Sequence, residues 1–428
     1  MLLLRTFLLC VLFPAAALVQ ACTAFKSTQH GRTLVGNNED AWSINAQVRF
    51  EQGRDGAYGA VYFGHFNGHP MRRMVDQLGM NERGLVFDGL GIQPKSVRPV
   101  PGRKQMPFDE LMPLVLRSCA DVHEAAAMLR TMDNSWLYSS MLFLVDRNGE
   151  YLIVEGDTLI LGNDPTYAVG NWRMSTCSDP DAIPIPRLQA GRTLLHQGLD
   201  STRTAALEVL RSMKACRARL GEGTLFSTLF DTKAGTAQLY FYHDFDQAVT
   251  FDLKEELAKG DRVLDMAALF PVNAEYERLL AYRTPFHQRW LFVALLLLGV
   301  AALIIAAMSG VLLLGKLIAR LRRRASTVDG WLQAILLLCC SATLLLLAFL
   351  LFNEGVYYFG LGQAVEPIWP PLRYLPALLV LAVLLLVVRI IPRMRDRRSG
   401  AFQRGALALF GAAELAFVGL LFYWQLVF

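Results

Sequence analysis

Four long apolar runs fill the last third of the chain, and they constrain its architecture more than any other feature. They cover residues 290–315, 331–352, 372–388 and 406–428. A helix of about 20 apolar residues is long enough to cross a bilayer. One such run alone could be a buried core helix, but four in succession predict a transmembrane domain of four helices over residues 289–428. The runs also explain a mean hydropathy of +0.32 in a chain that is 54% hydrophobic.

Basic residues beside these runs predict the orientation of the helices. Two loops are rich in Lys and Arg, and the loop at 353–367 has neither. Because basic loops stay in the cytoplasm, we expect a multi-pass protein of the cell or inner membrane, with residues 23–288 on the exoplasmic or periplasmic side. Orientation therefore explains the net charge of +5 better than a nucleic-acid partner does, and no nucleic-acid binding is predicted. The basic residues are Lys316, Arg320, Arg322, Arg323 and Arg324 after the first run, and Arg389, Arg393, Arg395, Arg397, Arg398 and Arg404 before the fourth.

Residues 1–21 have the pattern of a secretory signal peptide. Arg5 precedes an apolar stretch, and Val19-Gln20-Ala21 is a small-residue cleavage site. Cleavage there would make Cys22 the first residue of the mature protein and would export the same side that the charge rule predicts. An uncleaved anchor helix is one alternative. Lipidation of Cys22 is another, because residues 19–22 loosely resemble a bacterial lipoprotein motif.

A cysteine at a new N-terminus carries a thiol and a free α-amine on one residue. Since such an amine titrates at about 7.7–8.0, it can accept the proton of its own thiol near neutral pH. Cys22 is therefore a candidate N-terminal nucleophile. Three other cysteines in the exported part, Cys119, Cys177 and Cys216, allow at most one internal disulfide. No Cys/His spacing of the zinc type is present, so neither a metal nor a cofactor is predicted.

The part between the leader and the apolar runs alternates between strand and helix patterns. Strands, then helices, then strands predict a layered α+β domain over residues 22–255, followed by a linker over 256–288. We expect a hairpin turn at Gly31-Arg32, a turn at 79–83 and a helix N-cap at Asp121. Strands are predicted at 23–27, 33–37, 47–50, 57–65, 84–90, 141–145, 151–155, 227–230, 238–243 and 248–253, and helices at 108–119, 121–132, 186–199 and 202–215.

Several short motifs occur together in a recognisable order. Cys22-Thr23 is followed by Gly36-Asn37-Asn38-Glu39-Asp40, then by the turn at 79–85 and by the hairpin of 142–155. In these motifs residues 22–255 resemble the cysteine N-terminal-nucleophile (Ntn) hydrolases of the choloylglycine hydrolase, penicillin V acylase, acyl-coenzyme A:6-aminopenicillanate acyltransferase and acid ceramidase group. The resemblance implies a four-layer αββα sandwich ahead of the four-helix transmembrane domain.

The resemblance also implies roles for individual residues. Cys22 would attack an amide carbonyl and form an acyl-thioester that water then cleaves. Asp40 would hold the amine and thiol in register, and the Asn171 side chain would help to bind the oxyanion. Ordinary turn or surface roles are the alternatives for Asp40 and Asn171. Arg187 is similar to a later active-site arginine of the family. Arg192 is a competing choice, and a solvated helix face is the alternative for either. Asn134 is a further polar candidate without an assigned role.

Two positions depart from the pattern of bile-salt hydrolases. Asn37 stands where those enzymes carry an arginine, and Gly91 stands where they carry an oxyanion-hole asparagine. Both positions remain candidates for substrate or oxyanion contacts, and the Gly91 N–H could still donate. These departures count against a bile-salt substrate.

The sequence leaves three functional hypotheses. The first is a membrane-tethered amidase that hydrolyses a linear, non-peptide amide; its substrate would be a small-molecule acyl amide, and lipid-like amides are one option. The second is a non-catalytic ligand-binding sensor that signals through the four helices. A transporter or channel is the weakest, because the apolar runs contain few ionisable residues; Arg373 near an interface is the main exception. The helices are also candidates for a homo-oligomer contact.

Overall fold

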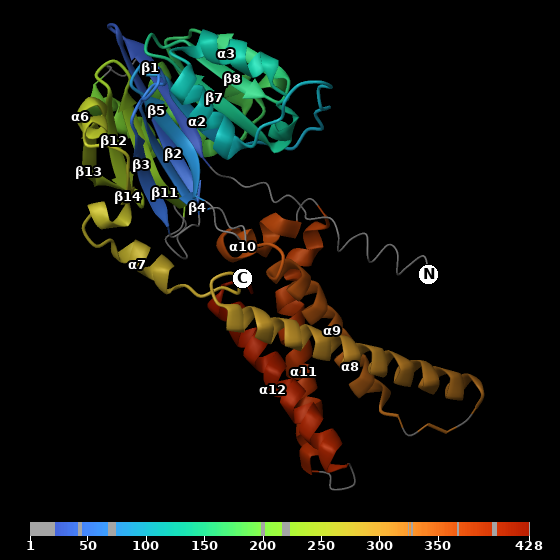
Figure 1. The fold of residues 1–428 in the computed structure, drawn as a ribbon. Coiled ribbons are helices and arrows are strands. Elements are labelled where there is room, and N and C mark those ends of the chain that lie inside the picture. The colour runs from blue at the N-terminus through green and yellow to red at the C-terminus, as the bar shows by residue number, and fades with distance from the viewer. Residues whose placement is uncertain are drawn as a thin grey trace. The chain divides into compact units, whose positions relative to one another are not determined.

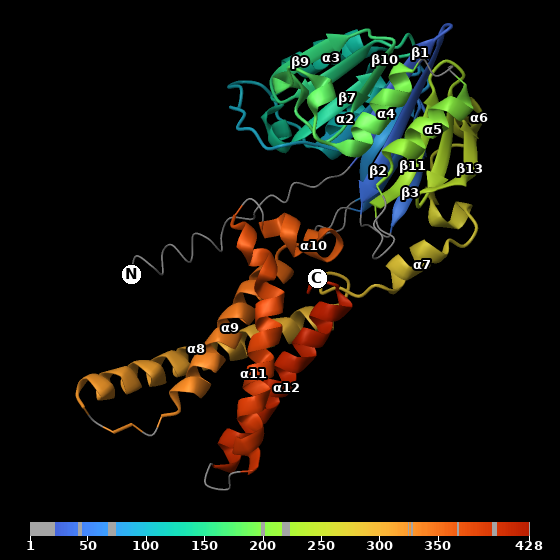
Figure 2. The same cartoon turned by 180° about the vertical axis from the view of Figure 1, so that it is seen from behind.

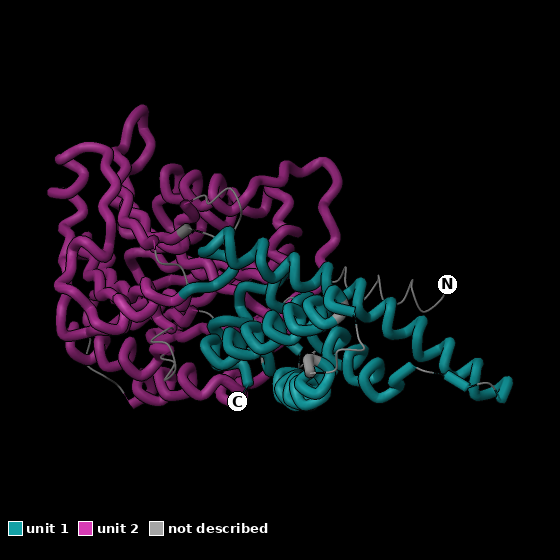
Figure 3. Tube along the Cα trace, turned by 90° about the horizontal axis from the view of Figure 1, so that it is seen from below, with its two compact units in different colours: residues 1–17, 283–428 teal, residues 18–282 magenta. Residues whose placement is uncertain are grey.

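The protein forms two compact units, Leu18–Tyr282 and a second unit of Arg283–Phe428 with Met1–Ala17 (Figure 3). The computed structural model describes residues 22–41, 45–66, 74–197, 202–215, 223–323, 325–326, 328–365, 368–395 and 400–427. The expected signal peptide and Cys216 lie outside these described residues.

The first unit contains an antiparallel sheet of six strands in the order β10-β1-β2-β11-β12-β13. Strands β1 and β2 form the expected hairpin, in whose turn His30 and Gly31 have positive φ angles of 50° and 72°. Thr23 pairs with Asn38, which places Cys22 beside the end of β2. The strands are β1 (Thr23–Gln29), β2 (Arg32–Ala41), β10 (Thr166–Val169), β11 (Gly223–Asp231), β12 (Thr236–Phe241) and β13 (Asp244–Asp252).

A second antiparallel sheet has eight strands in the order β14-β3-β4-β5-β6-β7-β8-β9. Aromatic side chains pack between the two sheets: the rings of Phe63 and Phe230 are 5.7 Å apart, and those of Phe50 and Phe251 are 5.3 Å apart. The strands are β3 (Ala46–Glu51), β4 (Ala60–Phe66), β5 (Met74–Asn81), β6 (Val86–Gly91), β7 (Ser140–Val145), β8 (Tyr151–Glu155), β9 (Thr158–Gly162) and β14 (Arg262–Asp265).

Helices cover the outer face of each sheet and complete the expected αββα sandwich (Figures 1 and 2). The helices α4 (Pro186–His196) and α5 (Arg203–Met213) pack on the six-stranded sheet. The helices α2 (Phe108–Ser118) and α3 (Val122–Thr131) pack on the eight-stranded sheet. Asp121 caps α3 as predicted, because its carboxylate accepts from the N–H groups of His123 and Glu124. Short 3-10 segments are η1 (Ser135–Ser139), η2 (Met174–Thr176), η3 (Pro180–Ala182), η4 (Ala267–Leu269) and η5 (Pro370–Tyr374).

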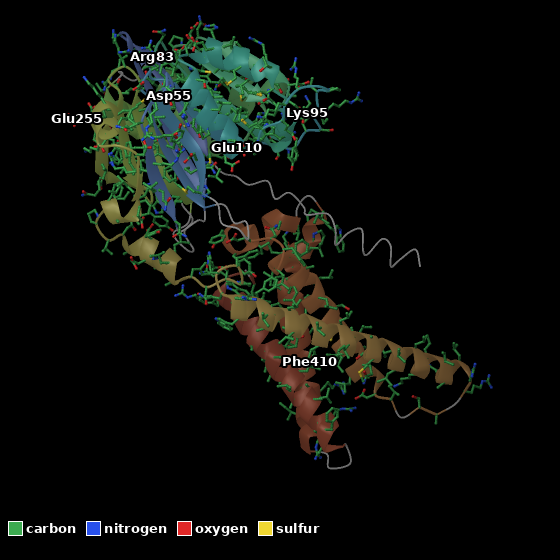
Figure 4. The ribbon with its side chains drawn as sticks, viewed as in Figure 1. Asp55, Arg83, Lys95, Glu110, Glu255 and Phe410 are labelled. Atoms are coloured by element: carbon green, nitrogen blue, oxygen red, sulfur yellow. The ribbon has the colours of Figure 1, made fainter. Side chains whose placement is uncertain are left out.

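Apolar side chains fill the inside of this unit, and charged side chains lie on its surface. Leu111, Val115 and Leu129 are fully buried between the helices and the eight-stranded sheet. Charged side chains such as Arg83 and Lys95 lie on the outside (Figure 4). The burial of these apolar helix faces fixes the helices on the sheet.

Strands β5 and β9 were not predicted, and two further stretches differ from the sequence-based expectation. Residues 79–81, expected in a turn, end strand β5, and Asn81 there donates to the carbonyls of Leu116 and Cys119 at 2.7 and 2.8 Å. The expected linker over 256–288 contains the end of α6 (Leu253–Ala258), strand β14 and helix α7 (Ala274–Ala281). Since β14 pairs with β3, the sandwich extends beyond residue 255.

The second unit is helical. Among the residues that the structure describes, four helices of this unit are long and apolar enough to cross a membrane, as predicted. They are α8 (Arg289–Leu321), α9 (Gly330–Leu350), α11 (Leu375–Arg395) and α12 (Ala401–Tyr423), and a shorter helix, α10 (Gly355–Val365), follows α9. Inside this unit the fully buried Glu414 of α12 accepts the Thr343 hydroxyl of α9 at 2.9 and 3.1 Å. No role was predicted for Glu414 from the sequence.

Candidate active site

Cys22 lies directly before β1 and is only 4% exposed. Its thiol donates to Glu39 Oε2 at 3.1 Å, and the other oxygen of Glu39 is 3.1 Å from His65 Nε2. Burial raises the pKa of the Cys22 thiol well above its usual range, and the negative charges of Glu39, Asp40 and Asp88 raise it further. Both effects favour the protonated thiol at neutral pH.

Asp40 lies near the end of β2 and is held from two sides. Its Oδ1 accepts the Thr224 hydroxyl of β11 at 2.6 Å, and its Oδ2 pairs with Arg187. Arg187 comes from the first turn of α4, directly after Pro186, a residue that favours the first helical position. Burial raises the pKa of the Asp40 carboxyl, and the Arg187 guanidinium partly offsets this.

Asn171 extends the arrangement from Arg187 to Gly91. Arg187 is 3.5 Å from Asn171 Oδ1, and Asn171 Nδ2 donates to the Gly91 carbonyl at 2.8 Å. The Asn171 backbone carbonyl accepts from Gln93 at 2.9 Å. The side-chain amide of Asn171 has two N–H donors, and the hydrogen bond to Gly91 uses one of them. Asp40, Arg187, Asn171 and Gly91 thus form one hydrogen-bonded series beside Cys22.

Asn37 lies against the carboxylate of Asp88, a residue without a predicted role. Its Nδ2 donates to Asp88 Oδ2 at 2.6 Å, which joins β2 of one sheet to β6 of the other. Asp88 is 1% exposed, and burial raises its pKa well above the usual range. Within the described part of the chain, Asn37 Oδ1 and Asp88 Oδ1 are both buried without a hydrogen-bond partner.

The structure separates the two competing arginines. Arg187 reaches Asp40, whereas Arg192 of the same helix pairs with Asp181 at 2.8 Å. Asn134 donates to the Leu129 carbonyl at 2.8 Å, so it closes the end of α3 rather than joining the group around Cys22.

Three residues near the thiol had no predicted role: Glu39, His65 and Asp88. Asp88 could have been noticed in the sequence, because a carboxylate within the mostly apolar strand Val86–Gly91 is unusual in a core. Glu39 gave the same signal in β2, where nine consecutive residues are buried. Nothing in the sequence around His65 connects it with Glu39.

The cysteines and histidines of the site provide no described metal centre. In the ranges that the structure covers, no group of three His, Cys, Asp or Glu side chains is arranged to hold a metal ion. Cys119 and Cys177 are free thiols.

Comparison with known proteins gives matches in structure. No protein-family model and no curated protein matches the chain by sequence. Two variants of the conjugated bile acid hydrolase from Clostridium perfringens are each 15% identical to it, with 59% of this chain and 97% of theirs covered and a TM-score of 0.44. Penicillin V acylase from Agrobacterium tumefaciens is 16% identical, with 57% and 91% covered and a TM-score of 0.43. The likeness is one of fold, at an identity too low to transfer a residue's role.

Proposed function

We propose that this protein is a membrane-tethered amidase that hydrolyses a linear, non-peptide amide with Cys22 as its N-terminal nucleophile. The observation that carries the proposal is the group of side chains that the fold brings to the head of β1. A buried thiol, a carboxylate–guanidinium pair and a side-chain amide come together from β1, β2, α4 and the segment after β10. Such a group is suited to acyl transfer. The preference for an amide follows from the sequence resemblance to Ntn acylases.

The proposed reaction has two steps. The free α-amine of mature Cys22 takes the thiol proton, and the sulfur attacks the amide carbon to form a C–S bond. The resulting ammonium then protonates the leaving nitrogen as the C–N bond breaks, which releases the amine. A water molecule next adds to the thioester and gives the carboxylic acid, and the thiol regains its proton.

The remaining side chains support this sequence of steps. The second N–H of Asn171 is a donor for the carbonyl oxygen as it becomes negative, a contribution worth about 100-fold in rate. Arg187 holds Asn171 and Asp40 together, and Asp40 fixes the end of β2 against β11 through Thr224.

The four apolar helices and the two basic loops support a multi-pass membrane protein with the sandwich on the exoplasmic or periplasmic side. A substrate that partitions into or near the bilayer suits such an enzyme, so N-acyl amino acids and lipid-like acyl amides are the first compounds to assay.

The test is hydrolysis of a panel of acyl amides by the purified full-length protein. We expect Cys22→Ala and Cys22→Ser to lower kcat/KM by at least about 1,000-fold. Cys177→Ser is the matched control, because Cys177 is a partly exposed free thiol outside the group, and it should keep the wild-type rate. Hydrolysis that survives both Cys22 substitutions would contradict the proposal.

A second candidate is a ligand-binding sensor without catalysis. The observation that favours it is the thiol itself, which is protonated and bonded to Glu39 with two further carboxylates nearby. Labelling with an electrophilic acyl probe separates the two functions. An enzyme forms a stoichiometric adduct at Cys22, and a sensor forms none.

A further inference from the structure

Glu39 is the carboxylate that touches the sulfur of Cys22, and its two oxygens have different partners. Oε2 accepts the thiol hydrogen at 3.1 Å, and Oε1 is 3.1 Å from Nε2 of His65. Glu39 is 3% exposed, so both contacts lie inside the fold. Transfer of the thiol proton to the α-amine gives neither Glu39 nor His65 a role in the proposed reaction.

The register of the β1–β2 hairpin brings Glu39 to the thiol. Thr23 lies opposite Asn38, so the same register places Cys22 opposite Glu39. Because neighbouring side chains of a strand point to opposite faces, Glu39 and Asp40 serve different sides of β2. Asp40 reaches helix α4 on the outer side, and Glu39 reaches strand β4 of the other sheet. Glu39 therefore faces the space between the sheets, at the thiol.

His65 fixes the orientation of the Glu39 carboxylate. An ionised carboxylate only accepts hydrogen bonds, so the contact with Oε1 requires the ring hydrogen to be on Nε2. This N–H holds Oε1 and leaves Oε2 directed at the sulfur. The side chain of His65 is 15% exposed and that of Glu39 is 4% exposed, so the pair extends from the buried thiol towards solvent.

The other two carboxyl groups near the thiol are engaged differently. Both oxygens of Asp40 have partners, the Thr224 hydroxyl and Arg187. Asp88 accepts from Asn37, and among the described residues its side chain has no hydrogen bond with the thiol. Glu39 is thus the carboxylate placed to act on the group that is bonded to the sulfur.

Acylation of Cys22 changes the partner of Oε2. The thiol hydrogen that this oxygen accepts is lost when the sulfur bonds to the acyl carbon, so Oε2 becomes a free acceptor beside the thioester. A buried acceptor without a hydrogen bond is costly, and a water molecule can supply the missing donor. A water bound to Oε2 lies next to the carbon that it must attack, because that carbon is bonded to the sulfur.

We propose that Glu39, oriented by His65, is the general base that activates water for hydrolysis of the acyl-thioester. The inference rests on the proposed function and adds a second base to it, since the α-amine of Cys22 serves the acylation step. The water oxygen bonds to the acyl carbon and gives one proton to Oε2. The C–S bond then breaks, Glu39 returns the proton to the sulfur, and the carboxylic acid leaves.

The experiment measures acylation and deacylation separately in the full-length, processed protein, with p-nitrophenyl octanoate as the acyl donor. With enzyme in excess, release of p-nitrophenolate gives the acylation rate. Loss of the octanoyl group from the Cys22 peptide, followed by mass spectrometry after quenching, gives the deacylation rate. We expect Glu39→Gln to slow deacylation by about 100-fold or more. Acylation should stay at the wild-type rate or rise, because the substitution removes a negative charge that disfavours the thiolate.

Glu150→Gln is the matched control, because Glu150 forms an exposed pair with His123 Nε2 at 3.0 Å. It removes the same charge from the same kind of pair outside the site, and it should leave both rates unchanged.

Two further measurements distinguish a base from a packing residue. Hydroxylamine attacks a thioester without the help of a base, so it should release the octanoyl group from Glu39→Gln and restore turnover. His65→Ala should slow deacylation, whereas His65→Gln, whose side chain keeps an N–H for Oε1, should retain most of the wild-type rate.

The results separate this inference from the proposed function. An adduct that Glu39→Gln hydrolyses at the wild-type rate overturns the inference alone and leaves the α-amine as the base of both steps. Acylation slowed as much as deacylation, or an adduct that hydroxylamine does not release, assigns Glu39 to packing and also overturns it. Absence of any adduct on wild-type Cys22 overturns the proposed function and this step with it. If Glu39→Gln does not fold, His65→Ala decides: slow deacylation supports the inference, and the wild-type rate contradicts it.

Discussion

Arg187 joins a buried carboxylate to the amide that we assign to the oxyanion. The Asp40 carboxyl lies where burial raises its pKa, and the neighbouring guanidinium lowers that pKa again. The folded protein therefore binds more protons at Asp40 than the unfolded chain does, between the ordinary value of 3.8 and the raised one. Across this window stability falls as pH rises, and it falls further without the guanidinium.

This balance predicts a pH-dependent cost for Arg187→Gln. We expect the variant to lose about 3 kcal/mol of unfolding free energy near pH 7.5, because it leaves a buried charge unpaired. The loss should shrink towards about pH 5, as Asp40 takes up a proton in the fold. Thermal unfolding at both pH values measures this.

Arg192→Gln is the control for that prediction, since its partner Asp181 is 70% exposed in its side chain. An exposed pair contributes about 0–1 kcal/mol, so this variant should change stability little at either pH. An equal loss for Arg187→Gln at both pH values would contradict the argument.

Single residues of the site were predictable where a local motif carried them. Cys22 and Asp40 belong to one hairpin, whose register follows from its turn, so the sequence pattern alone places them together. Arg187 and Arg192 lie on one helix, and tertiary packing decides which of them reaches Asp40. The contact between Asn37 and Asp88 joins strands of different sheets, and no spacing along the chain indicates it.

At the scale of elements, strand β14 is the clearest case of a segment whose role depends on its partner. Its four residues carry too short an alternation to be read as a strand, and they lie in a stretch of mixed polarity. In the structure Leu264 lies opposite Val48, and the Met266 N–H donates to the Ala46 carbonyl at 3.0 Å. Since N–H groups two residues apart point the same way along a strand, the Leu264 N–H also faces β3.

Leu264→Pro tests whether this stretch is part of the sandwich. Proline removes an N–H from the ladder, and we expect a loss of about 1–3 kcal/mol in unfolding free energy. Val272→Pro is the control, because Val272 is 86% exposed between β14 and α7. Equal stability of the two variants would mean that residues 256–288 behave as a linker.

The pairing of α9 and α12 makes a second prediction at this scale. Thr343→Val keeps the shape of the side chain but leaves the Glu414 carboxyl without its described donor. We expect a loss of about 1–2 kcal/mol in the stability of the helical unit in detergent. The double variant Thr343→Val/Glu414→Leu should recover part of that loss, because no polar group is then left unpaired.

Ser341→Ala is the matched control for this pair, because it deletes a hydroxyl on the exposed face of α9. It should leave stability unchanged. A double variant less stable than Thr343→Val alone would show that Glu414 has another stabilising contact.

The existence of the four helices was predictable from the length of the apolar runs. The contact between Thr343 and Glu414 was not predictable, because one polar residue barely alters a hydropathy pattern.

At the scale of the whole molecule, the helical unit shows which helix ends lie together. Arg393, at the end of α11, pairs with Asp329, the N-cap of α9, at 2.7 Å. The start of α9 and the end of α11 therefore lie at the same end of the unit. Arg283 begins this unit, and its carbonyl accepts from Trp424 Nε1 at 2.8 Å, while the Trp424 ring packs on Tyr357 of α10. The start of the unit, α10 and the end of α12 thus gather together.

This arrangement, with the positive-inside rule, predicts which residues reagents can reach from outside an intact cell. Cysteines placed singly at Ser326, in the first basic loop, and at Ile368, between α10 and α11, distinguish the two sides. A membrane-impermeant maleimide should modify Ile368→Cys in intact cells and Ser326→Cys only after permeabilisation, as read from each peptide by mass spectrometry. Detergent-treated samples, in which both positions should react, are the control. The reverse pattern would place the sandwich in the cytoplasm, where no secretory leader would be removed, and Cys22 would then lack the free amine on which the proposed chemistry depends.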